Sequence, residues 1–396
     1  MYWQGLKILK YSRYCNIISV VMLMLCAYKY RLYPTKEQIE FFSKSFGCVR
    51  FIYNKMLGDR IEFYNEHKEK LNNAPAQYKD EFPWLKEVDS LALASAWSNL
   101  QAAYNKFFSE PNTGFPNFKA KYKSKASYTT HNQKGTVAVS ERYIKLPKIG
   151  LVRIKKHREI EGLIKSATIS MEPSGKYYVS ILVEQNDFEK LILDGSTVGI
   201  DLGITDYAIT SDGGKIENPR CLVKSEKRLK KLQRDLSRKK KKYKNRNKSR
   251  IKVARQHDKI KNQRKDFLHK ESKRLIDENQ VICLEDLNVK GLVKNHKLAK
   301  HISDVSWSKF KTYLEYKAKW YGSEIIYIDR FFPSSQICSC CGHRDGKKPL
   351  DIRQWKCPKC GIIHDRDINA AKNILAEGMK IRTAGIAGLA CGVLPS

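Results

Sequence analysis

Acidic side chains are scarce in this sequence of 396 residues: 41 Asp and Glu stand against 75 Lys and Arg, which leaves a formal net charge of +34. A folded protein with this charge repels itself unless a polyanion binds it, and the commonest large polyanion is nucleic acid. The shortage of acid therefore disfavours small-molecule metabolism and favours DNA or RNA as the partner. A basic surface like that of a ribosomal protein is the simpler alternative.

A hydrophobic run long enough to cross a membrane is also missing. The apolar stretch Ile17–Ala27 is too short to span a bilayer, and no small-x-small cleavage site follows it. At the same time, 42% hydrophobic residues are too many for a disordered basic tail. We therefore expect a folded, multidomain, cytoplasmic protein with no membrane partner, in which residues 1–23 are either an upstream extension or a packed first strand.

The sequence also lacks the cysteine spacing of a disulfide-bonded scaffold. Five of the 11 Cys fall within 23 residues, whereas the cysteines of a disulfide scaffold are spread along a short secreted chain. The cluster contains two C-x-x-C-G knuckles separated by 15 residues, a strong signal for one structural Zn²⁺ held by four thiolates. The predicted ligands are Cys338, Cys341, Cys357 and Cys360. Cys340 competes with Cys341, but the glycine after Cys341 matches the glycine after Cys360, so Cys341 is assigned.

The N-terminal part of the chain predicts a strand and a helical unit. Residues 26–33 read as a strand, and the four residues from Thr35 have the form of a capping box that opens a helix. Apolar side chains then recur at helical spacing to about Met56, and a second helical pattern covers residues 93–107. We expect a helical domain over residues 35–125, with its aromatic side chains forming a core.

A β unit follows in the sequence. Residues 136–185 alternate in short β stretches with a turn at 172–175, and with the first strand they predict a small β-barrel or sandwich. Before it, residues 114–128 interleave Phe and Tyr with Lys. Because aromatic rings stack on bases while Lys neutralises phosphates, this segment is a candidate nucleic-acid contact, with an anchored surface loop as an equal alternative.

Residues 221–275 concentrate the positive charge. They hold 24 Lys and Arg against 5 Asp and Glu, which is +19 of the total of +34. A thin apolar stripe at helical spacing, interrupted near residues 245–249, predicts two basic helices packed as a hairpin. A charged face is usually only solvated, but this density favours a surface that follows phosphates. The stripe comprises Leu229, Leu232, Leu236, Tyr243, Ile260, Phe267 and Leu275.

Two acidic segments lie in strands. Residues 197–204 form an apolar strand with Asp201 in its middle, where an unpaired carboxylate is costly to bury and no basic residue is near in sequence. A bound metal ion is the economical explanation. Residues 281–289 form a second apolar strand, which ends at Glu285 and Asp286 and so places at least one carboxylate at its carboxyl end.

A third acidic segment, residues 364–375, opens a helix-forming run with Asp365 or Asp367. Alone, each segment is a weak signal, because acidic residues commonly cap strands and helices. Two strands and a helix that each contribute one carboxylate can hold two divalent ions about 4 Å apart for phosphodiester hydrolysis. Hard oxygen ligands suit Mg²⁺ or Mn²⁺.

The order of these motifs resembles the TnpB (OrfB) family, which is encoded by transposons and related to the compact type V CRISPR nucleases. The matching stretches are GIDLGITDYAITSDG, VICLEDLNVKG, the paired CxxC ribbon and DRDINAAKNIL. AYKYRLYPTKEQ and GFPNFKAKYKSKASY resemble the N-terminal half of the family. The likeness therefore covers residues 27–378.

The resemblance implies a multidomain α+β protein whose nuclease domain is RuvC-like, of RNase H fold, with an inserted zinc ribbon. By motif position the metal-binding carboxylates are Asp201, Glu285 and Asp367: Asp367 occupies the acidic place of D-x-N-A-A, and Glu285 the E of L-E-D-L. The β unit is expected to be the wedge domain and the helical unit the recognition domain. The expected boundaries are 24–34 and 126–190 for the wedge, 35–125 for the recognition domain, 191–335 and 363–378 for the nuclease, 336–362 for the ribbon, and 379–396 for a C-terminal tail.

The resemblance also implies the partners. Family members bind a guide RNA from the end of their own element and cleave double-stranded DNA that pairs with it beside a short flanking motif. We therefore expect a guide RNA and a double-stranded DNA target, with Mg²⁺ or Mn²⁺ at the catalytic site. Transposition of such an element would need a separate transposase.

Two other functions use the same features. A DNA strand transferase would use the same three-carboxylate fold to join DNA ends. The His-hydrophobe-His motif of single-strand transposases is absent, because none of the nine His are spaced two apart. A non-catalytic nucleic-acid-binding regulator would use only the basic hairpin, and it predicts that Asp201→Ala leaves every activity intact.

Overall fold

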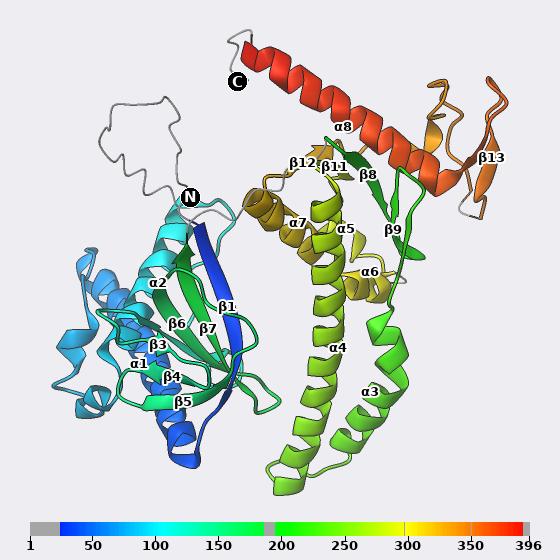
Figure 1. Cartoon of the computed structure of the whole chain (residues 1–396). Helices are drawn as coiled ribbons and strands as arrows, with labels where there is room; N and C mark the ends of the chain where they lie inside the picture. The colour runs from blue at the N-terminus through cyan, green and yellow to red at the C-terminus, as the bar shows by residue number, and fades with distance from the viewer. Residues whose placement is uncertain (1–23, 186–194, 297, 350, 391–396) are drawn as a thin grey trace. The chain divides into compact units, whose positions relative to one another are not determined.

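The computed structural model describes residues 24–185, 195–296, 298–349 and 351–390 (Figure 1). The expected upstream extension, residues 1–23, lies outside the described residues. The chain divides into two compact units. The N-terminal unit holds most of the chain up to residue 187, and the C-terminal unit holds the remainder together with two short pieces, Lys119–Ser127 and Ser170–Tyr178.

The first helix of the N-terminal unit begins where the sequence predicts, and the second begins three residues before the predicted range. Helix α1 (Lys36–His67) opens with the predicted capping box: the Thr35 side chain accepts the N–H of Gln38, and the Gln38 side chain accepts the N–H of Thr35. The helix continues well beyond the expected end near Met56. Helix α2 (Ser90–Ser109) packs against it, and two 3₁₀ turns, Pro75–Tyr78 and Pro83–Glu87, lie between them in sequence.

The β stretches of this unit form one sheet of seven strands in the order β2-β6-β7-β1-β5-β4-β3. The first strand lies inside the sheet, antiparallel to β5 with Leu32 opposite Ile154, so strands far apart in sequence share one hydrogen-bonded layer. The alternating burial along β7 matches the predicted period of two. The strands are β1 (Met24–Tyr33), β2 (Ala126–His131), β3 (Ala138–Val139), β4 (Tyr143–Leu146), β5 (Gly150–Lys155), β6 (Leu163–Met171) and β7 (Tyr177–Gln185).

The aromatic residues of segment 114–128 do not share one environment. Tyr128 is buried against Phe42 and Phe46, with ring centroids 6.3 and 5.9 Å away, so its inclusion in a nucleic-acid contact was wrong. Its position on β2 directs the ring into the core. Tyr122, by contrast, is 93% exposed and is available to a partner.

The C-terminal unit is built on a five-stranded sheet in the order β10-β9-β8-β11-β12. Strands β10 and β8 are both antiparallel to β9, which lies between them, whereas β11 is parallel to both β8 and β12. The strands are β8 (Thr197–Leu202), β9 (Asp206–Thr210), β10 (Lys215–Glu217), β11 (Val281–Glu285) and β12 (Glu324–Ile328).

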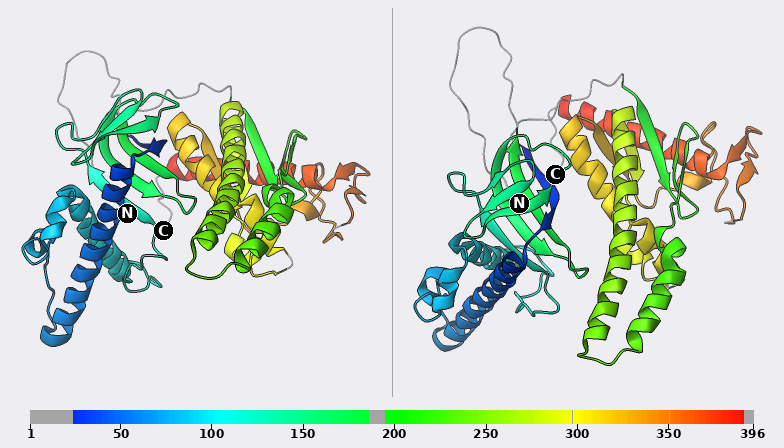
Figure 2. Two further views of the ribbon diagram at one scale, coloured as in Figure 1. Left: turned by 90° about the horizontal axis from the view of Figure 1, so that it is seen from below. Right: turned by 60° about the horizontal axis from the view of Figure 1, so that its bottom comes forward.

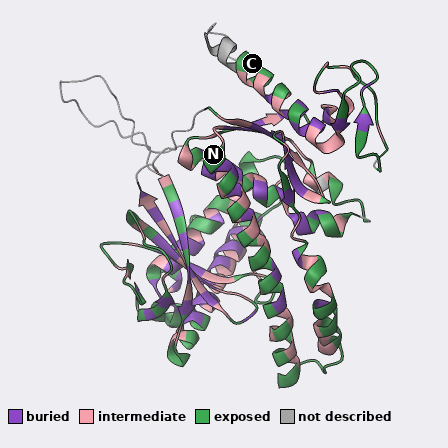
Figure 3. Ribbon diagram, turned by 45° about the vertical axis from the view of Figure 1, so that its right-hand side comes forward, coloured by how far each residue is buried: buried purple, intermediate pink, exposed green. Residues whose placement is uncertain are grey.

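Helices cover both faces of this sheet (Figure 3). Because side chains alternate along a strand, Ile282 and Leu284 of β11 pack with α4 and α7, whereas Val281 and Cys283 pack on the side of α8. The continuous apolar composition of β11 is typical of a strand buried on both faces. The covering helices are α4 (Lys244–Glu278), α7 (Trp307–Tyr321) and α8 (Arg366–Ala390).

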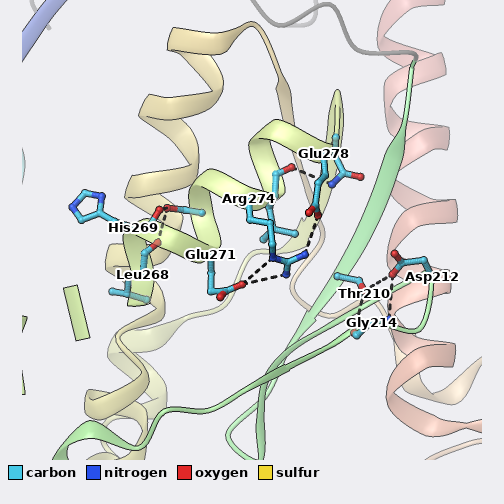
Figure 4. A network of polar contacts seen from close by, with 11 residues as sticks. Thr210, Asp212, Gly214, Leu268, His269, Glu271, Arg274 and Glu278 are labelled. Carbon is cyan, nitrogen blue, oxygen red and sulfur yellow. Dashed lines mark hydrogen bonds and ion pairs between the residues drawn. The ribbon is translucent and has the colours of Figure 1, made fainter. Parts of the chain in front are cut away.

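A Gly-rich turn with the sequence Asp212-Gly213-Gly214 joins β9 to β10 (Figure 4). The Thr210 hydroxyl donates to the Asp212 carboxylate, and the Gly214 N–H donates to the same carboxylate at 3.3 Å. These hydrogen bonds hold the pKa of Asp212 below its usual value, the bond from Thr210 contributing most. In the same view, Arg274 on α4 pairs with Glu271 and Glu278 at 3.1 and 2.9 Å.

The basic segment forms the predicted hairpin of α3 (Cys221–Ser237) and α4 (Figure 2). The break lies at residues 238–243, earlier than predicted, and Tyr243 is 66% exposed instead of contributing to the apolar stripe. The cause is Arg246, whose Nη1 donates to the carbonyl oxygens of Leu236 and Lys239 and so satisfies the end of α3.

The remaining elements connect the sheet to the cysteine ribbon. They are α5 (Val289–Leu292), α6 (Ala299–Val305), the 3₁₀ turn Ser334–Gln336, β13 (Gln354–Lys356) and β14 (Ile363–Asp365). Helix α8 continues to Ala390, through most of the range expected as a C-terminal tail. Among the described residues, no helix is both long enough and apolar enough to cross a bilayer.

Candidate active site and zinc site

Asp201 and Glu285 lie at the same end of two neighbouring strands. β8 and β11 are parallel and Leu284 pairs with Ile200, so the next residue on each strand brings Glu285 beside Asp201 at the carboxyl edge of the sheet. Both side chains are half-buried. The structure therefore brings together the first two carboxylates that the sequence singled out.

The first turn of α8 brings the third carboxylate to this edge. The helix crosses β8 at Gly199, where a Cβ atom would overlap the carbonyl oxygen of Ala371 and lie 2.6 Å from the amide nitrogen of Leu375. Ala371 is one helical turn beyond Asp367, and Gly199 is two residues before Asp201 on the same face of the strand. The close approach of the two backbones therefore places Asp367 near Asp201.

The three carboxylates affect one another electrostatically. Burial raises the pKa of Asp201 to about 7, and the negative charges of Glu285 and then Asp367 add to the increase, while Arg366 opposes it. Burial also raises the pKa of Glu285, opposed by a hydrogen bond that the Ser334 hydroxyl donates to it at 2.7 Å. A cluster of this kind is stabilised by a bound cation.

The neighbouring acidic residues have other partners. Asp365 caps α8: it accepts two backbone N–H groups of the first turn at 3.0 and 3.1 Å, and the Nζ of Lys215 at 3.0 Å. Asp286 accepts the Nζ of Lys311 and the Nη2 of Arg330, both at 2.9 Å. The two backbone N–H groups bound by Asp365 and the two cations bound by Asp286 support the preference for Asp367 and for Glu285, which remains a prediction.

Arg353 is a residue of this site that the sequence reasoning missed. Its Nη1 lies 3.1 Å from Oδ2 of Asp367, and its carbonyl oxygen accepts the N–H of Arg366 at 2.8 Å. The antiparallel pairing of β13 with β14, with Gln354 opposite Asp365, makes this contact. No local pattern links two residues that are brought together only by strand pairing.

The four predicted zinc ligands lie together. The sulfur atoms of Cys338, Cys341, Cys357 and Cys360 are all within 4.8 Å of one another. Two of the separations are 3.6 Å, from Cys338 to Cys360, and 3.7 Å, from Cys341 to Cys357. A tetrahedron with Zn–S bonds of about 2.3 Å has edges of about 3.8 Å, so the donor set and its spacing fit Zn²⁺.

The two knuckles have the same backbone geometry. In each, the N–H of the first cysteine donates to a carbonyl five residues on, and the N–H of the glycine donates back to the first cysteine, all at 2.9 Å. Both glycines, Gly342 and Gly361, have a positive φ, of 71° and 74°. The match between the glycines that follow Cys341 and Cys360 therefore predicted correctly that Cys341 belongs to the cluster. Cys340 is exposed and lies outside the cluster.

One histidine joins the ribbon to α8. His364 is buried, its Nε2 lies 3.0 Å from the sulfur of Cys338, and its ring is 4.9 Å from that of Trp355. Because His364 immediately precedes the helix cap Asp365, the ribbon and the first turn of α8 are one continuous structure. The ribbon therefore positions the segment that carries Asp367.

Three family models match separate parts of the chain. They are described as "Helix-turn-helix domain" for residues 22–69, "Probable transposase" for residues 180–296, and "Cas12f1-like, TNB domain" for residues 307–374. Within the first range, the described residues form the strand β1 and the single long helix α1. The other two ranges include the strands with Asp201 and Glu285, the ribbon, and Asp367.

Relatives cover almost the whole chain. A Streptomyces pristinaespiralis protein named "Putative RNA-guided DNA endonuclease" is 41% identical over 92% of this chain and 90% of its own length. The Escherichia coli K12 protein "Putative RNA-guided DNA endonuclease InsQ" is 31% identical over 94% of this chain and 95% of its own.

A solved structure has a similar fold. The effector chain of a complex titled "Cryo-EM structure of the Cas12f1-sgRNA-target DNA complex" aligns with a TM-score of 0.58 and 14% identity, over 86% of this chain and 83% of that one. With the near full-length match to the named endonucleases, this likeness agrees with the motifs read from the sequence. The chain belongs to the TnpB (OrfB) family of RNA-guided DNA endonucleases.

Proposed function

We propose that this protein cuts double-stranded DNA under the direction of a bound guide RNA, by metal-dependent hydrolysis at Asp201, Glu285 and Asp367. The observation that carries the proposal is the convergence of these three carboxylates at one edge of the sheet, where the charges of Glu285 and Asp367 help to raise the pKa of Asp201 to about 7. Carboxylates are gathered in this way where a cation holds them together.

The donor set suits Mg²⁺ or Mn²⁺. Asp201 makes no hydrogen bond or ion pair with the part of the chain that the structure describes, and the Ser334 hydroxyl is the partner of Glu285. Asp201 and Glu285, half-buried and without a basic partner, leave hard oxygen atoms for divalent ions, whereas Asp367 also pairs with Arg353. The same three residues would hold two ions, which when bound would activate a water molecule and stabilise the leaving 3′ oxygen.

The protein side chains supply position and charge. Ser334 orients the Glu285 carboxylate through its hydrogen bond, and Arg353 orients Asp367 through its ion pair. Arg353 and Arg366 also place positive charge beside the carboxylates, where a DNA phosphate must bind. The Asp365 cap holds the first turn of α8, which keeps Asp367 at the edge of the sheet.

The architecture supports the rest of the assignment. A sheet in which three antiparallel strands are extended by two parallel ones, with helices on both faces, is consistent with an RNase H-like, RuvC-type nuclease domain. We assign the seven-stranded sheet as the wedge and the α1–α2 pair as the recognition domain. The net charge of +19 over residues 221–275 suits an RNA–DNA heteroduplex. A short flanking motif on the DNA and a separate transposase complete the proposal.

The first test is to purify the full chain with its native locus expressed and to sequence the RNA that copurifies. One abundant RNA that ends in sequence adjoining the element would identify the guide and the DNA target. A plasmid with the matching target should then be linearised when Mg²⁺ is added. Joined DNA ends in place of linear products would indicate strand transfer instead.

Matched variants test the three carboxylates. Asp201→Ala, Glu285→Gln and Asp367→Ala should each abolish cleavage with little effect on RNA binding. Glu377→Gln on α8 and Asp277→Asn on α4 are the controls, because each carboxylate pairs with a lysine on its own helix, away from the three proposed ligands. Cleavage that persists in one of the first three variants would remove that residue from the site.

A further inference from the structure

The turn that follows β12 lies next to the proposed catalytic glutamate. β12 is parallel to β11, and Ile328 pairs with Glu285, so the residues after Ile328 leave the sheet at the edge that carries the carboxylates. The same turn ends at Ser334, whose hydroxyl donates to Glu285. Residues 329–334 therefore border the active site on one side.

Hydrogen bonds hold this turn in place. The Asp329 carboxylate accepts the N–H of Phe331 at 2.7 Å, and the carbonyl of Asp329 accepts the N–H of Phe332 at 3.2 Å. Farther on, Asn373 of α8 donates to the carbonyl of Ser334 at 2.8 Å. The two adjacent phenylalanines consequently face opposite ways: Phe332 packs on the core beneath α8, whereas Phe331 is 85% exposed.

The exposed ring borders an open groove of about 690 Å³. Phe331 forms one part of the lining, Lys311 and Arg330 contribute two cationic groups, and the ring of Tyr327 lies 3.8 Å from the Nζ of Lys311. Both cations also contact Asp286, which fixes their positions. Arg330 uses Nε and Nη2 in this contact, so within the described residues its Nη1 has no hydrogen-bond acceptor.

We infer that this groove is a nucleotide subsite for the DNA strand being cut, with Phe331 as the platform on which one unpaired base stacks. An aromatic face with neighbouring cationic donors is the combination that binds single-stranded nucleic acid without reading its sequence. Bases in a duplex are already stacked on each other, so a platform of this kind accepts a strand only where it is unpaired. The inference rests on the proposed function, and it adds the place on the protein where the cut DNA strand binds.

The subsite gives Phe331 a positioning role. Phe331 lies three residues beyond Ile328, which pairs with Glu285 on the neighbouring strand, so a base held on this ring lies at the edge of the sheet that carries the carboxylates. The groove lining holds two cations, Lys311 and Arg330, and two carboxylates, Asp286 and Asp329, so its charge is balanced. Stacking on Phe331, more than phosphate attraction, is therefore what retains the nucleotide.

The test uses the full chain with its guide RNA and double-stranded targets in which one abasic nucleotide is moved through the positions around the cut. Wild-type cleavage should slow about ten-fold when the base that stacks on Phe331 is missing. Phe331→Ala should slow cleavage of unmodified DNA by a similar factor and should be insensitive to the abasic nucleotide at that position. Phe331→Trp should behave as wild type, since it restores an aromatic face.

The control is Ile381→Ala, which truncates an exposed side chain on α8 beyond the site and should change nothing. Equal cleavage by wild type and Phe331→Ala, or equal sensitivity to every abasic position, would overturn the inference. A Phe331→Ala variant that loses affinity for the guide RNA would show that the groove takes RNA, which also overturns it.

A separate readout distinguishes failure of the inference from failure of the proposed function. Binding of a labelled single-stranded DNA to the protein–RNA complex is measured in enough salt to screen the basic hairpin. Phe331→Ala should weaken this binding about ten-fold whether or not the complex cuts DNA. Absent cleavage with weakened binding would reject the proposed function alone, and unchanged binding would reject the subsite.

Discussion

The zinc site and the carboxylate site, both in the C-terminal unit, are built in opposite ways. Each zinc knuckle is a short loop whose cysteines are held by hydrogen bonds within the same few residues, with a positive-φ glycine closing the turn. The carboxylates come from two strands and a helix that are far apart in sequence. One site is therefore determined by local geometry and the other by packing.

The two sites differ in what holds their ligands in place when no ion is bound. In the cysteine cluster, hydrogen bonds between residues a few positions apart fix the backbone of each knuckle, so the ligands are positioned by their neighbours in sequence. At the carboxylate site, burial first and then the charges of Glu285 and Asp367 raise the pKa of Asp201, so its ionised form is destabilised by desolvation and by repulsion. Packing of α8 on β8 at Gly199 must hold the carboxylates together against that repulsion. The proposed active site is thus maintained at a cost to stability.

The largest expected effect is at the carboxylate site, where one substitution should abolish activity and increase stability. Asp201→Asn should reduce cleavage by roughly 10³-fold or more, because a ligand of the divalent ions is lost. The metal-free variant should nevertheless unfold at higher denaturant concentration at pH 8, with a gain of about 2–4 kcal/mol. Denaturant titrations measure the gain in unfolding free energy, and cleavage assays on the same variant measure the loss of activity.

The pH dependence of that gain has a definite sign. The pKa of Asp201 is raised in the folded state from 3.8 to about 7, so its ionised form costs stability as pH rises through this window, and the full cost is present above pH 7. The gain of Asp201→Asn should therefore shrink as pH falls from 7 to 4. A gain that does not change with pH would contradict the electrostatic origin.

The next effect tests whether the ribbon supports the carboxylates. Cys357→Ser should release zinc, measured by metal analysis of the purified protein, because a tetrahedral site loses one of its four thiolates. Cleavage should fall about 100-fold, since the segment that carries Asp367 follows directly from the ribbon and small displacements of reacting groups are costly. Cys340→Ser is the matched control. It should keep zinc and activity, because Cys340 lies outside the cluster.

The third effect tests the packing that gathers the carboxylates. Gly199→Ala should lower the free energy of unfolding by about 3 kcal/mol, because its Cβ would force α8 away from β8. Cleavage should fall as well, whereas zinc content should remain the same. Gly47→Ala on α1 is the control: its Cβ meets no atom within 4 Å, so it should stabilise by about 0.5–1 kcal/mol. Equal unfolding free energies for the two variants would refute the close approach.

The smallest effect concerns a buried cation in the same unit. The Lys317 amine is buried and donates to the carbonyl of His269 and the hydroxyl of Ser272 at 2.7 and 2.8 Å. Burial lowers its pKa from 10.5 to about 8, so the unfolded chain binds more protons between these values and stability rises with pH there. Lys317→Met should be the more stable protein at pH 7, and its advantage should narrow between pH 8 and 10.5. Unfolding free energies across that range test the sign.

Sequence reasoning succeeded where the signal is local. The capping box at Thr35 and the two knuckles were both predicted, because their hydrogen bonds join residues a few positions apart. It was wrong about the break in the basic hairpin. There, the long side chain of Arg246 reaches back to the end of α3, and no composition pattern signals such a cap.

Tyr128 and Arg353 show a second limit. An aromatic residue beside lysines reads as a nucleic-acid contact, but the strand that contains Tyr128 turns its ring against Phe42 and Phe46. Arg353 has no motif of its own and reaches Asp367 only because β13 pairs with β14. In both cases the pairing of a strand with its neighbours decides which way the side chain points and which residue it contacts. This pairing joins residues that no local sequence pattern connects.

By itself, the sequence determined the family, the members of the four-cysteine cluster and the three carboxylate segments, because each is recorded in residue type and short spacing. Only the tertiary structure decided that Asp201, Glu285 and Asp367 converge and that Asp365 and Asp286 are occupied by other partners. It also decided that Phe331 is exposed in the turn after β12 while Phe332 packs on the core beneath α8. The physical reason is that these outcomes depend on parallel strand register and on a helix lying against a glycine, which are contacts between residues distant along the chain.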